Sequence, residues 1–235
     1  MKIALLLPLI VILGCSSAQP ITELEKVVPE PLGKEALLAK VKENYSQWSS
    51  LSATFILKGK VENAEILYDG TMTGSGNSFN IVLKDPVFRS PFVSMRVNGD
   101  TVTQIDHLRD RSQSLPLDQF KWVEVFGKVF PFGFFYPILK GYPPEVIFDP
   151  TANYSLPKPG QERLTVKKQD WEAIVNFESQ IMTSVFFRTM NDKEIVILAF
   201  SGKQNTARYF PGEILVTRPN SNDFIKIQFK SMKVQ

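Results

Sequence analysis

The sequence predicts a mainly β protein of the α+β class, in which about ten antiparallel strands curl into a barrel or an incomplete barrel. Apolar and polar residues alternate with a period of two over most of the chain after residue 49, which is typical of strands with one apolar face. Several connections between these stretches are short enough for hairpins. Helical spacing is confined to two stretches. A curled sheet with an apolar inner face can act as a container.

Residues 1–14 have the pattern of a signal peptide. Lys2 supplies a positive start, and the apolar run that follows is shorter than the ~20 residues that span a bilayer. The string Ile12-Leu13-Gly14-Cys15 resembles a bacterial lipobox, so Cys15 is the expected lipid attachment site. The alternatives are an ordinary secretory signal with an incidental cysteine, or an anchor that is never cleaved.

Residues 15–33 are expected to form a flexible tether, because three prolines interrupt any helix. A protein of this kind is held on a membrane of the cell envelope by its lipid. The diacylglycerol and the amide-linked acyl group of a bacterial lipoprotein suffice for stable anchoring. In the sorting system of Gram-negative lipoproteins, an Asp after the cysteine resembles a signal for retention in the inner membrane. Ser16 stands at this position and therefore favours the periplasmic face of the outer membrane.

Composition bounds the remaining function classes. The formal charge of +3 is spread among acidic residues, which argues against a nucleic-acid partner. The 18 Phe contrast with one Cys and one His, so disulfides and metal-thiolate sites are excluded. Residues 34–235 suffice for one domain with a substantial core, expected to be a monomer.

The first regular element is a predicted amphipathic helix over residues 34–48. Its apolar residues recur at helical spacing, whereas the lysines and Glu43 fall mostly elsewhere. The apolar positions are Leu37, Leu38, Val41, Tyr45 and Trp48.

After residue 49 the period changes to two and predicts a five-stranded antiparallel meander. Residues 62–65 and 74–77 are short enough for hairpin connections, and Asn98-Gly99 is a strong hairpin turn. The apolar positions of these strands are Phe55, Leu57, Val61, Ile66, Tyr68, Met72, Phe79, Ile81, Leu83, Val93, Met95, Val97, Val102 and Ile105.

The middle of the chain breaks this alternation. Pro116 is placed like a first-turn helix proline, and the apolar residues after it recur at roughly helical spacing, which predicts a helix. These residues are Phe120, Trp122, Val123, Phe126, Val129 and Phe130. Residues 131–144 are rich in proline and aromatic side chains and must be largely buried, either as core or as a lid over an apolar cavity.

Strands resume at Arg163. Residues 171–177 alternate, and residues 181–187 and 195–200 are apolar on both faces, as expected of central or covered strands. The chain closes with residues 214–217 and a final strand in which Ile225, Ile227 and Phe229 alternate with polar residues.

The order of these elements, together with five short strings, resembles the LolB family of outer-membrane lipoprotein receptors over most of residues 34–235. The strings are Asn77-Ser78-Phe79-Asn80-Ile81-Val82-Leu83-Lys84-Asp85-Pro86, Asn98-Gly99-Asp100, Leu115-Pro116-Leu117, Ile214-Leu215-Val216-Thr217 and Ile225-Lys226-Ile227-Gln228-Phe229. The chain is more loosely similar to the soluble carrier LolA, but the lipobox favours LolB, which is itself a lipoprotein.

This resemblance implies an incomplete barrel whose concave face is covered by helices. It also implies a hydrophobic cavity that receives lipoprotein acyl chains from a LolA-like periplasmic carrier. The family also includes carriers of other acylated lipids, and residues 130–159 look longer than its usual pattern, so the cargo class stays open. The expected cavity residues are Phe79, Ile81, Leu83, Met95, Val97, Trp122, Phe126, Phe130, Ile225, Ile227 and Phe229.

Val87 and Phe88 lie between prolines in a connection that cannot pair regularly. Loops normally run over the surface, so these side chains either project outward or fold back to cap the barrel rim. The resemblance favours a protruding loop that inserts its apolar tip into the membrane to release cargo.

Catalysis finds little support. His107 lies between Asp106 and Asp110, which forms an acid–base or metal cluster on paper, but a solvated strand end explains the same charges. No nucleophile elbow, P-loop or metalloprotease motif occurs. We therefore expect no catalytic residue, no metal and no cofactor. The competing function class is a structural or interaction lipoprotein whose core is filled by its own side chains.

Overall fold

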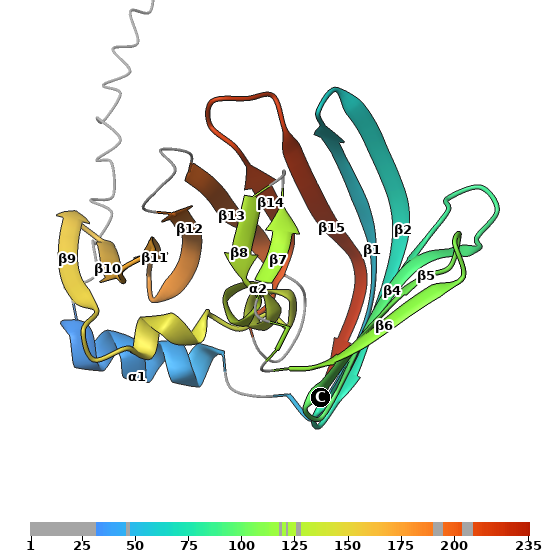
Figure 1. The fold of residues 1–235 in the computed structure, drawn as a ribbon. Helices are drawn as coiled ribbons and strands as arrows, with labels where there is room; N and C mark the ends of the chain where they lie inside the picture. The colour runs from blue at the N-terminus through green and yellow to red at the C-terminus, as the bar shows by residue number, and fades with distance from the viewer. Residues whose placement is uncertain are drawn as a thin grey trace, which may run out of the picture.

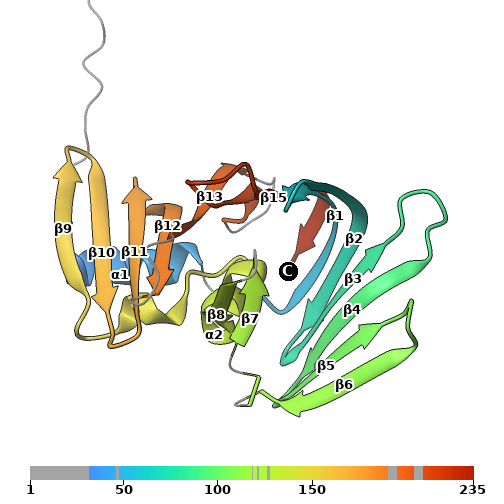
Figure 2. The same ribbon diagram turned by 45° about the horizontal axis from the view of Figure 1, so that its top comes forward.

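The computed structural model describes residues 32–45, 48–117, 119–120, 122–125, 128–189, 195–203 and 209–235. Within these residues the chain forms one sheet of 13 strands and a separate two-stranded hairpin. The large sheet curves around the hairpin and the short helix beside it, so that it is an open horseshoe in cross-section (Figures 1 and 2).

Every neighbouring pair in the large sheet is antiparallel. One arm consists of β1 (Ser50–Val61), β2 (Ala64–Ser75), β3 (Ser78–Lys84), β4 (Pro91–Asn98), β5 (Thr101–Asp106) and β6 (Arg111–Pro116). The other arm consists of β9 (Asn153–Lys158), β10 (Gln161–Lys167), β11 (Trp171–Glu178), β12 (Ile181–Thr189), β13 (Ile195–Lys203), β14 (Pro211–Thr217) and β15 (Phe224–Val234).

The two arms meet where β1 pairs with β15, and each remaining strand of the sheet pairs only with its neighbours along the chain. The edge strands β6 and β9 do not pair with each other, so the barrel is not closed. The prediction of a mainly β, incomplete antiparallel barrel is confirmed, and the sheet has more strands than the ten expected.

Both edge strands are absent from the prediction. β6 has the sequence Arg-Ser-Gln-Ser-Leu-Pro and is almost wholly exposed, and β9 carries a proline and is exposed at most positions. An edge strand needs no apolar face and tolerates proline on its unpaired side, so neither leaves an alternating pattern in the sequence. Pro116 is the last residue of β6, paired with Thr101, and not the start of a helix.

The helix predicted after Pro116 is wrong. β7 (Trp122–Val125) and β8 (Lys128–Pro131) pair as antiparallel strands here, followed by helix α2 (Phe132–Leu139). β-branched and aromatic residues dominate both strands and favour extended backbone. In a segment this dense in apolar residues, helical and alternating spacings both find matches, so the period alone could not decide.

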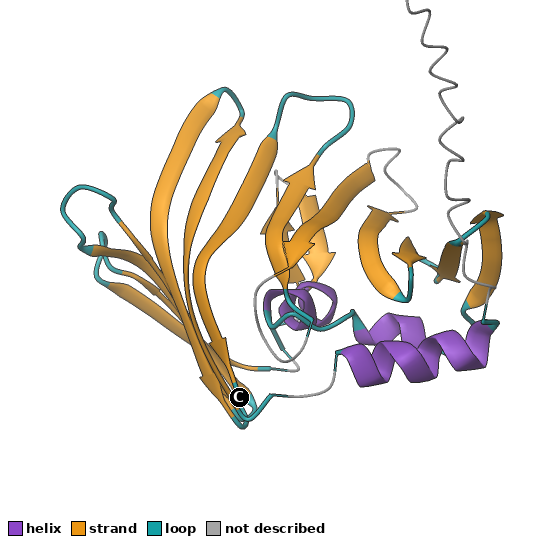
Figure 3. Ribbon diagram, turned by 180° about the vertical axis from the view of Figure 1, so that it is seen from behind, coloured by secondary structure: helices purple, strands orange, loops and turns teal. Residues whose placement is uncertain are grey.

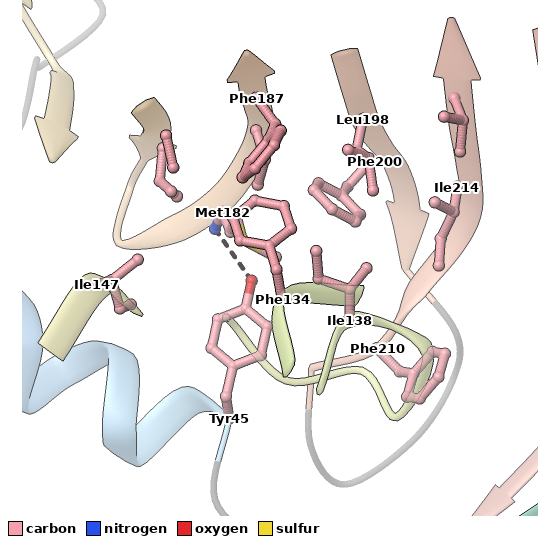
Figure 4. Close-up of a cluster of buried hydrophobic side chains, with 14 of the residues drawn as sticks. Tyr45, Phe134, Ile138, Ile147, Met182, Phe187, Leu198, Phe200, Phe210 and Ile214 are labelled. Carbon is pink, nitrogen blue, oxygen red and sulfur yellow. Dashed lines mark hydrogen bonds between the residues drawn. The ribbon is translucent and has the colours of Figure 1, made fainter. Parts of the chain in front are cut away.

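The N-terminal helix α1 (Lys34–Asn44) is shorter than predicted but buries the expected face. Leu37 and Val41 are fully buried, and Tyr45 and Trp48 continue the buried stripe beyond the helix end. The Tyr45 hydroxyl accepts a 3.0 Å hydrogen bond from the Met182 amide, which joins this segment to β12 (Figure 4). Burial raises the pKa of Tyr45, so its phenol stays protonated.

The helices lie on the concave side of the sheet (Figure 3). Phe134 of α2 packs against Phe187 of β12 at 4.9 Å between ring centroids, and Tyr136 packs edge-on against Phe79 of β3 at 5.6 Å. A short 3₁₀ helix, η1 (Glu145–Phe148), buries Ile147. Within the described part of the chain, no helix is both long enough and apolar enough to cross a bilayer.

Candidate functional site on the concave face

The strand register brings predicted site residues from both ends of the domain onto one face. Met72 lies opposite Ile81, which lies opposite Met95. On the neighbouring strands Leu57 lies opposite Ile227. Because side chains alternate along a strand, this face also carries the other predicted strand residues, namely Phe79, Leu83, Val97, Ile225 and Phe229.

Burial along this face is graded. Phe79 and Val97 are each 1% exposed at the end of the strands covered by α2, whereas Ile81, Leu83 and Met95 are only partly buried. Ile227 and Phe229 are buried and Ile225 is partly buried. The helices therefore cover one end of the concave face, and apolar side chains remain accessible at the other.

The accessible apolar surface extends toward the ends of β2 and β4. Tyr68 stacks on Phe92 with ring centroids 4.9 Å apart, and Leu83 lies opposite Val93. A bulge between Leu83 and Lys84 interrupts the β3–β4 register at this point, just before the connecting loop. A continuous apolar strip therefore runs from beneath α2 to the base of that loop.

The loop of residues 85–90 presents its apolar tip outward. The Asp85 carboxylate accepts hydrogen bonds from the amides of Val87 and Phe88 at 2.8 and 2.7 Å. Arg89 takes a left-handed backbone conformation, φ 58°, and its guanidinium pairs with Asp69. The side chains of Val87 and Phe88 are 77% and 81% exposed, so they do not cap the rim.

A second exposed apolar residue lies close by and was not predicted. Leu108 is 69% exposed in the turn between β5 and β6, and the His107 amide of that turn donates a 3.0 Å hydrogen bond to the Phe92 carbonyl. Both connections lie at the same end of the sheet, at the right of Figure 2. The signal available in the sequence for this exposed side chain was a leucine among charged residues, two positions after Asp106. In the structure the Asp106 carboxylate accepts hydrogen bonds from the amides of Leu108 and Arg109 and so closes the turn.

The predicted residues of the middle segment cannot be placed in the site. Trp122 lies in β7 and Phe130 in β8, in strands whose side chains are not described, and Phe126 lies outside the described residues. Cys15, the signal peptide of residues 1–14 and nearly all of the tether of residues 15–33 also lie outside them. Their roles stay predictions.

Helix α2 occupies part of the concavity. Phe134, 4% exposed, and Ile138, 2% exposed, point from α2 toward the strands β12 to β14, where Phe187, Leu198 and Ile214 are buried (Figure 4). These residues fill the space under the helix. The partly buried apolar residues lie on the β2–β4 arm, away from this packed region.

The candidate catalytic cluster does not assemble. His107 Nε2 lies 3.0 Å from the hydroxyl of Ser94, a residue that is 8% exposed, and the Asp106 carboxylate is engaged with the amides and guanidinium of its own turn. Among the described residues, no three His, Cys, Asp or Glu side chains gather as a metal site would require. The concave face is a surface suited to apolar contact.

Comparison with known proteins shows which fold this is. No family model and no curated protein matches the sequence. Among solved structures, an outer membrane lipoprotein-sorting protein domain from Vibrio parahaemolyticus superposes with a TM-score of 0.65 at 12% identity, covering 86% of this chain and 92% of that one.

Two further structures have the same architecture. A LolA superfamily protein from Nitrosomonas europaea gives a TM-score of 0.56 at 13% identity, covering 86% and 93% of the two chains. A DUF1329 family protein from Desulfovibrio piger gives 0.62 at 9% identity, covering 86% and 92%. The chain therefore has the open half-barrel fold of LolA superfamily proteins, and this likeness does not single out LolB.

Proposed function

We propose that this protein is a membrane-anchored lipid-handling lipoprotein, without enzymatic activity, that holds the acyl chains of other lipoproteins against the concave face and delivers them to the outer membrane. One observation carries the proposal: apolar side chains that are only partly buried, at Ile81, Leu83 and Met95, lead to an exposed apolar loop tip. Sites for apolar ligands are concave and lined mainly by such side chains. The structural neighbour described as a lipoprotein-sorting domain supports the same function.

The loop tip would act at the delivery step. Moving a phenylalanine side chain from water into an apolar phase is worth about 1.5–3 kcal/mol, which is enough to orient a tethered domain on a bilayer but not to anchor it. Val87 and Phe88 would enter the membrane while the acyl chains leave along the strip. The cargo would arrive from a LolA-like periplasmic carrier.

The loop is tested by replacing Val87 and Phe88 with glutamate in one chain. Because both side chains are exposed, the double variant should keep its stability within about 0.5 kcal/mol and should still bind acyl chains. Transfer of a bound lipoprotein into liposomes should fall by at least about tenfold, since two carboxylates resist entry into the bilayer.

The matched control is Leu156→Glu, on the edge strand β9, where the leucine is 47% exposed and far from the loop along the sheet order. This variant should transfer cargo at the normal rate. Normal transfer by the double loop variant would show that the loop is an idle connection.

A second function remains in competition, because α2 already fills part of the concavity with Phe134 and Ile138. In this alternative the protein is a structural or interaction lipoprotein that holds no cargo. Carriage of an acylated lipid other than a lipoprotein is a variant of the first proposal and uses the same surface.

A further inference from the structure

A pocket of about 360 Å³ opens between α1, α2 and η1, apart from the apolar strip. Its walls include Tyr136 of α2, Lys140 and Tyr142 of the following turn, and Lys42 of α1. Unlike the concave face of the sheet, it combines aromatic rings with ammonium groups. Nothing in the proposed acyl-chain site uses these groups.

The fold fixes the position of Lys140 closely. The Tyr142 amide donates to the Pro137 carbonyl at 2.8 Å, and the Gly141 amide donates to the Ile138 carbonyl at 2.9 Å. Together with the left-handed backbone of Gly141, φ 77°, these bonds form a Schellman motif that ends α2. The Lys140 carbonyl also accepts a 3.0 Å bond from the Trp48 indole, so the backbone at Lys140 is held from both sides.

Three aromatic rings surround the Lys140 ammonium. Its nitrogen lies 4.9 Å from the ring centroid of Tyr136, 5.4 Å from that of Tyr142 and 5.5 Å from that of Trp48. Ring faces attract a cation, but they do not accept the three strong hydrogen bonds that an ammonium can donate. Among the described residues, no carboxylate or carbonyl oxygen lies within hydrogen-bond distance of this nitrogen.

The charge of Lys140 is therefore only partly compensated. The side chain is half-buried, and burial lowers the pKa of its ammonium, while the exposed Glu145 carboxylate at the rim opposes this only in part. Lys42 adds a second cation, with its nitrogen 5.0 Å from the Phe148 ring. The pocket thus carries two cations against one carboxylate and has space beside them.

We propose that this pocket binds a phosphate-type oxyanion, held by Lys140 together with Lys42, which also lines it. Tyr136 lines the pocket and also packs against Phe79, at the end of the concave face that α2 covers. An oxyanion here would therefore lie close to the acyl-chain surface. The oxyanion could be the head group of an anionic lipid cargo, and this part of the inference rests on the proposed function. It could equally be a free phosphate, which requires no cargo.

The test uses the full-length chain in a neutral maltoside detergent and measures binding of radiolabelled inorganic phosphate and of decyl phosphate by equilibrium dialysis. Lys140→Met keeps the aliphatic stem and removes the charge, so the affinity for the bound ligand should fall at least tenfold. Lys140→Arg keeps the charge and should stay within about threefold of the unmodified chain. The control is Lys58→Met, an exposed lysine on β1, which should change nothing.

The two ligands separate the sources of the oxyanion. Binding of inorganic phosphate but not of decyl phosphate, lost in Lys140→Met, identifies a site for a free oxyanion. Binding of both ligands in mutual competition, again lost in Lys140→Met, identifies an oxyanion site that also admits a lipid head group. Binding of decyl phosphate without inorganic phosphate, lost in Lys140→Met, identifies a head-group site. If neither ligand binds, or if Lys140→Met binds as tightly as the unmodified chain, the inference is wrong and the ring cluster only stabilises the fold.

A neutral ligand keeps this result separate from the proposed function. Dodecanol has an acyl-type chain without an anion, and its binding should be equal in the unmodified chain and in Lys140→Met. If neither the unmodified chain nor Lys140→Met binds dodecanol, while the unmodified chain binds phosphate, the acyl-chain site is wrong and the oxyanion pocket is still supported. Equal thermal unfolding of the variants excludes loss of the fold as the cause.

Discussion

At Asp85, a single carboxylate determines how the β3–β4 loop presents its apolar residues. It accepts hydrogen bonds from the amides of Val87 and Phe88, which the loop cannot pair within the sheet. Both side chains point to solvent. The Asp-Pro start of this loop was visible in the sequence. The sequence did not show whether Val87 and Phe88 are exposed or cap the rim, because this depends on the three-dimensional course of the backbone.

Cys15 is the residue on which the proposed location depends. Replacing it by serine removes the only thiol in the chain, so lipid attachment and cleavage by the lipoprotein peptidase should both be lost. Metabolic labelling with palmitate measures the first effect, and the size of the protein on a gel measures the second. Incorporation of label into the Cys15→Ser chain would show that lipid is attached elsewhere, or that there is no lipoprotein processing at this residue.

Lys140 and Leu108 show what residue-level analysis of the sequence misses. The sequence around each gives little sign of its surroundings, which come from residues distant in sequence: Trp48 for Lys140, and for the turn of Leu108 the carbonyl of Phe92, which accepts a hydrogen bond from His107. A lone lysine inside the long aromatic and proline-rich run was the only signal for the pocket. Such a signal indicates burial of part of the side chain but not the rings around it.

At the scale of elements, α2 depends on the turn that ends it. Gly141 has φ 77°, and a Cβ at this residue would lie 2.3 Å from the Phe210 ring. Gly141→Ala should therefore combine backbone strain with overpacking and reduce the free energy of unfolding by about 3 kcal/mol or more. Chemical denaturation measures this loss.

The matched control is Gly76→Ala, in the turn between β2 and β3. Its φ is 52°, but nothing lies within 4 Å of an added Cβ, so only the backbone strain of about 1 kcal/mol is expected. Equal losses in the two variants would contradict the tight packing of α2 and its turn against Phe210.

The elements that the sequence predicts well are those that bury one face. α1, the meander β1 to β5 and the strands β10 to β15 each present apolar residues at the right period to a shared core. The edge strands β6 and β9 and the hairpin β7–β8 were missed, because the first two are mostly exposed and the third lies in a run that is apolar at nearly every position. Periodicity reports burial, and it is silent where burial is absent or uniform.

At the scale of the whole molecule, an open sheet leaves part of its apolar face only partly covered by the described residues. α2 and the hairpin lie inside one region of the horseshoe (Figure 2), and on the β2–β4 arm Ile81, Leu83 and Met95 are only partly buried. The curled sheet was predictable from the number of alternating strands. Its failure to close was not, because closure depends on whether the edge strands meet in space.

Comparing Leu83→Asn with Val82→Asn tests which face of this arm binds the acyl chain. Leu83 points to the concave face and Val82, the next residue along β3, to the other, and both are partly buried. An amide that meets an acyl chain without a hydrogen-bond partner costs about 1–3 kcal/mol, so Leu83→Asn should weaken binding roughly 5- to 150-fold. Val82→Asn should leave binding unchanged.

The central claim, that the concave face of the β2–β4 arm holds an acyl chain, is tested most directly by crosslinking with a photoactivatable fatty acid and mapping the modified residues by mass spectrometry. We predict that the label concentrates on Ile81, Leu83 and Met95, that excess unlabelled fatty acid removes it, and that Leu83→Asn reduces it. Label spread equally over Val82 and the outer face, or label that excess fatty acid does not displace, would contradict the claim and favour a structural protein without cargo.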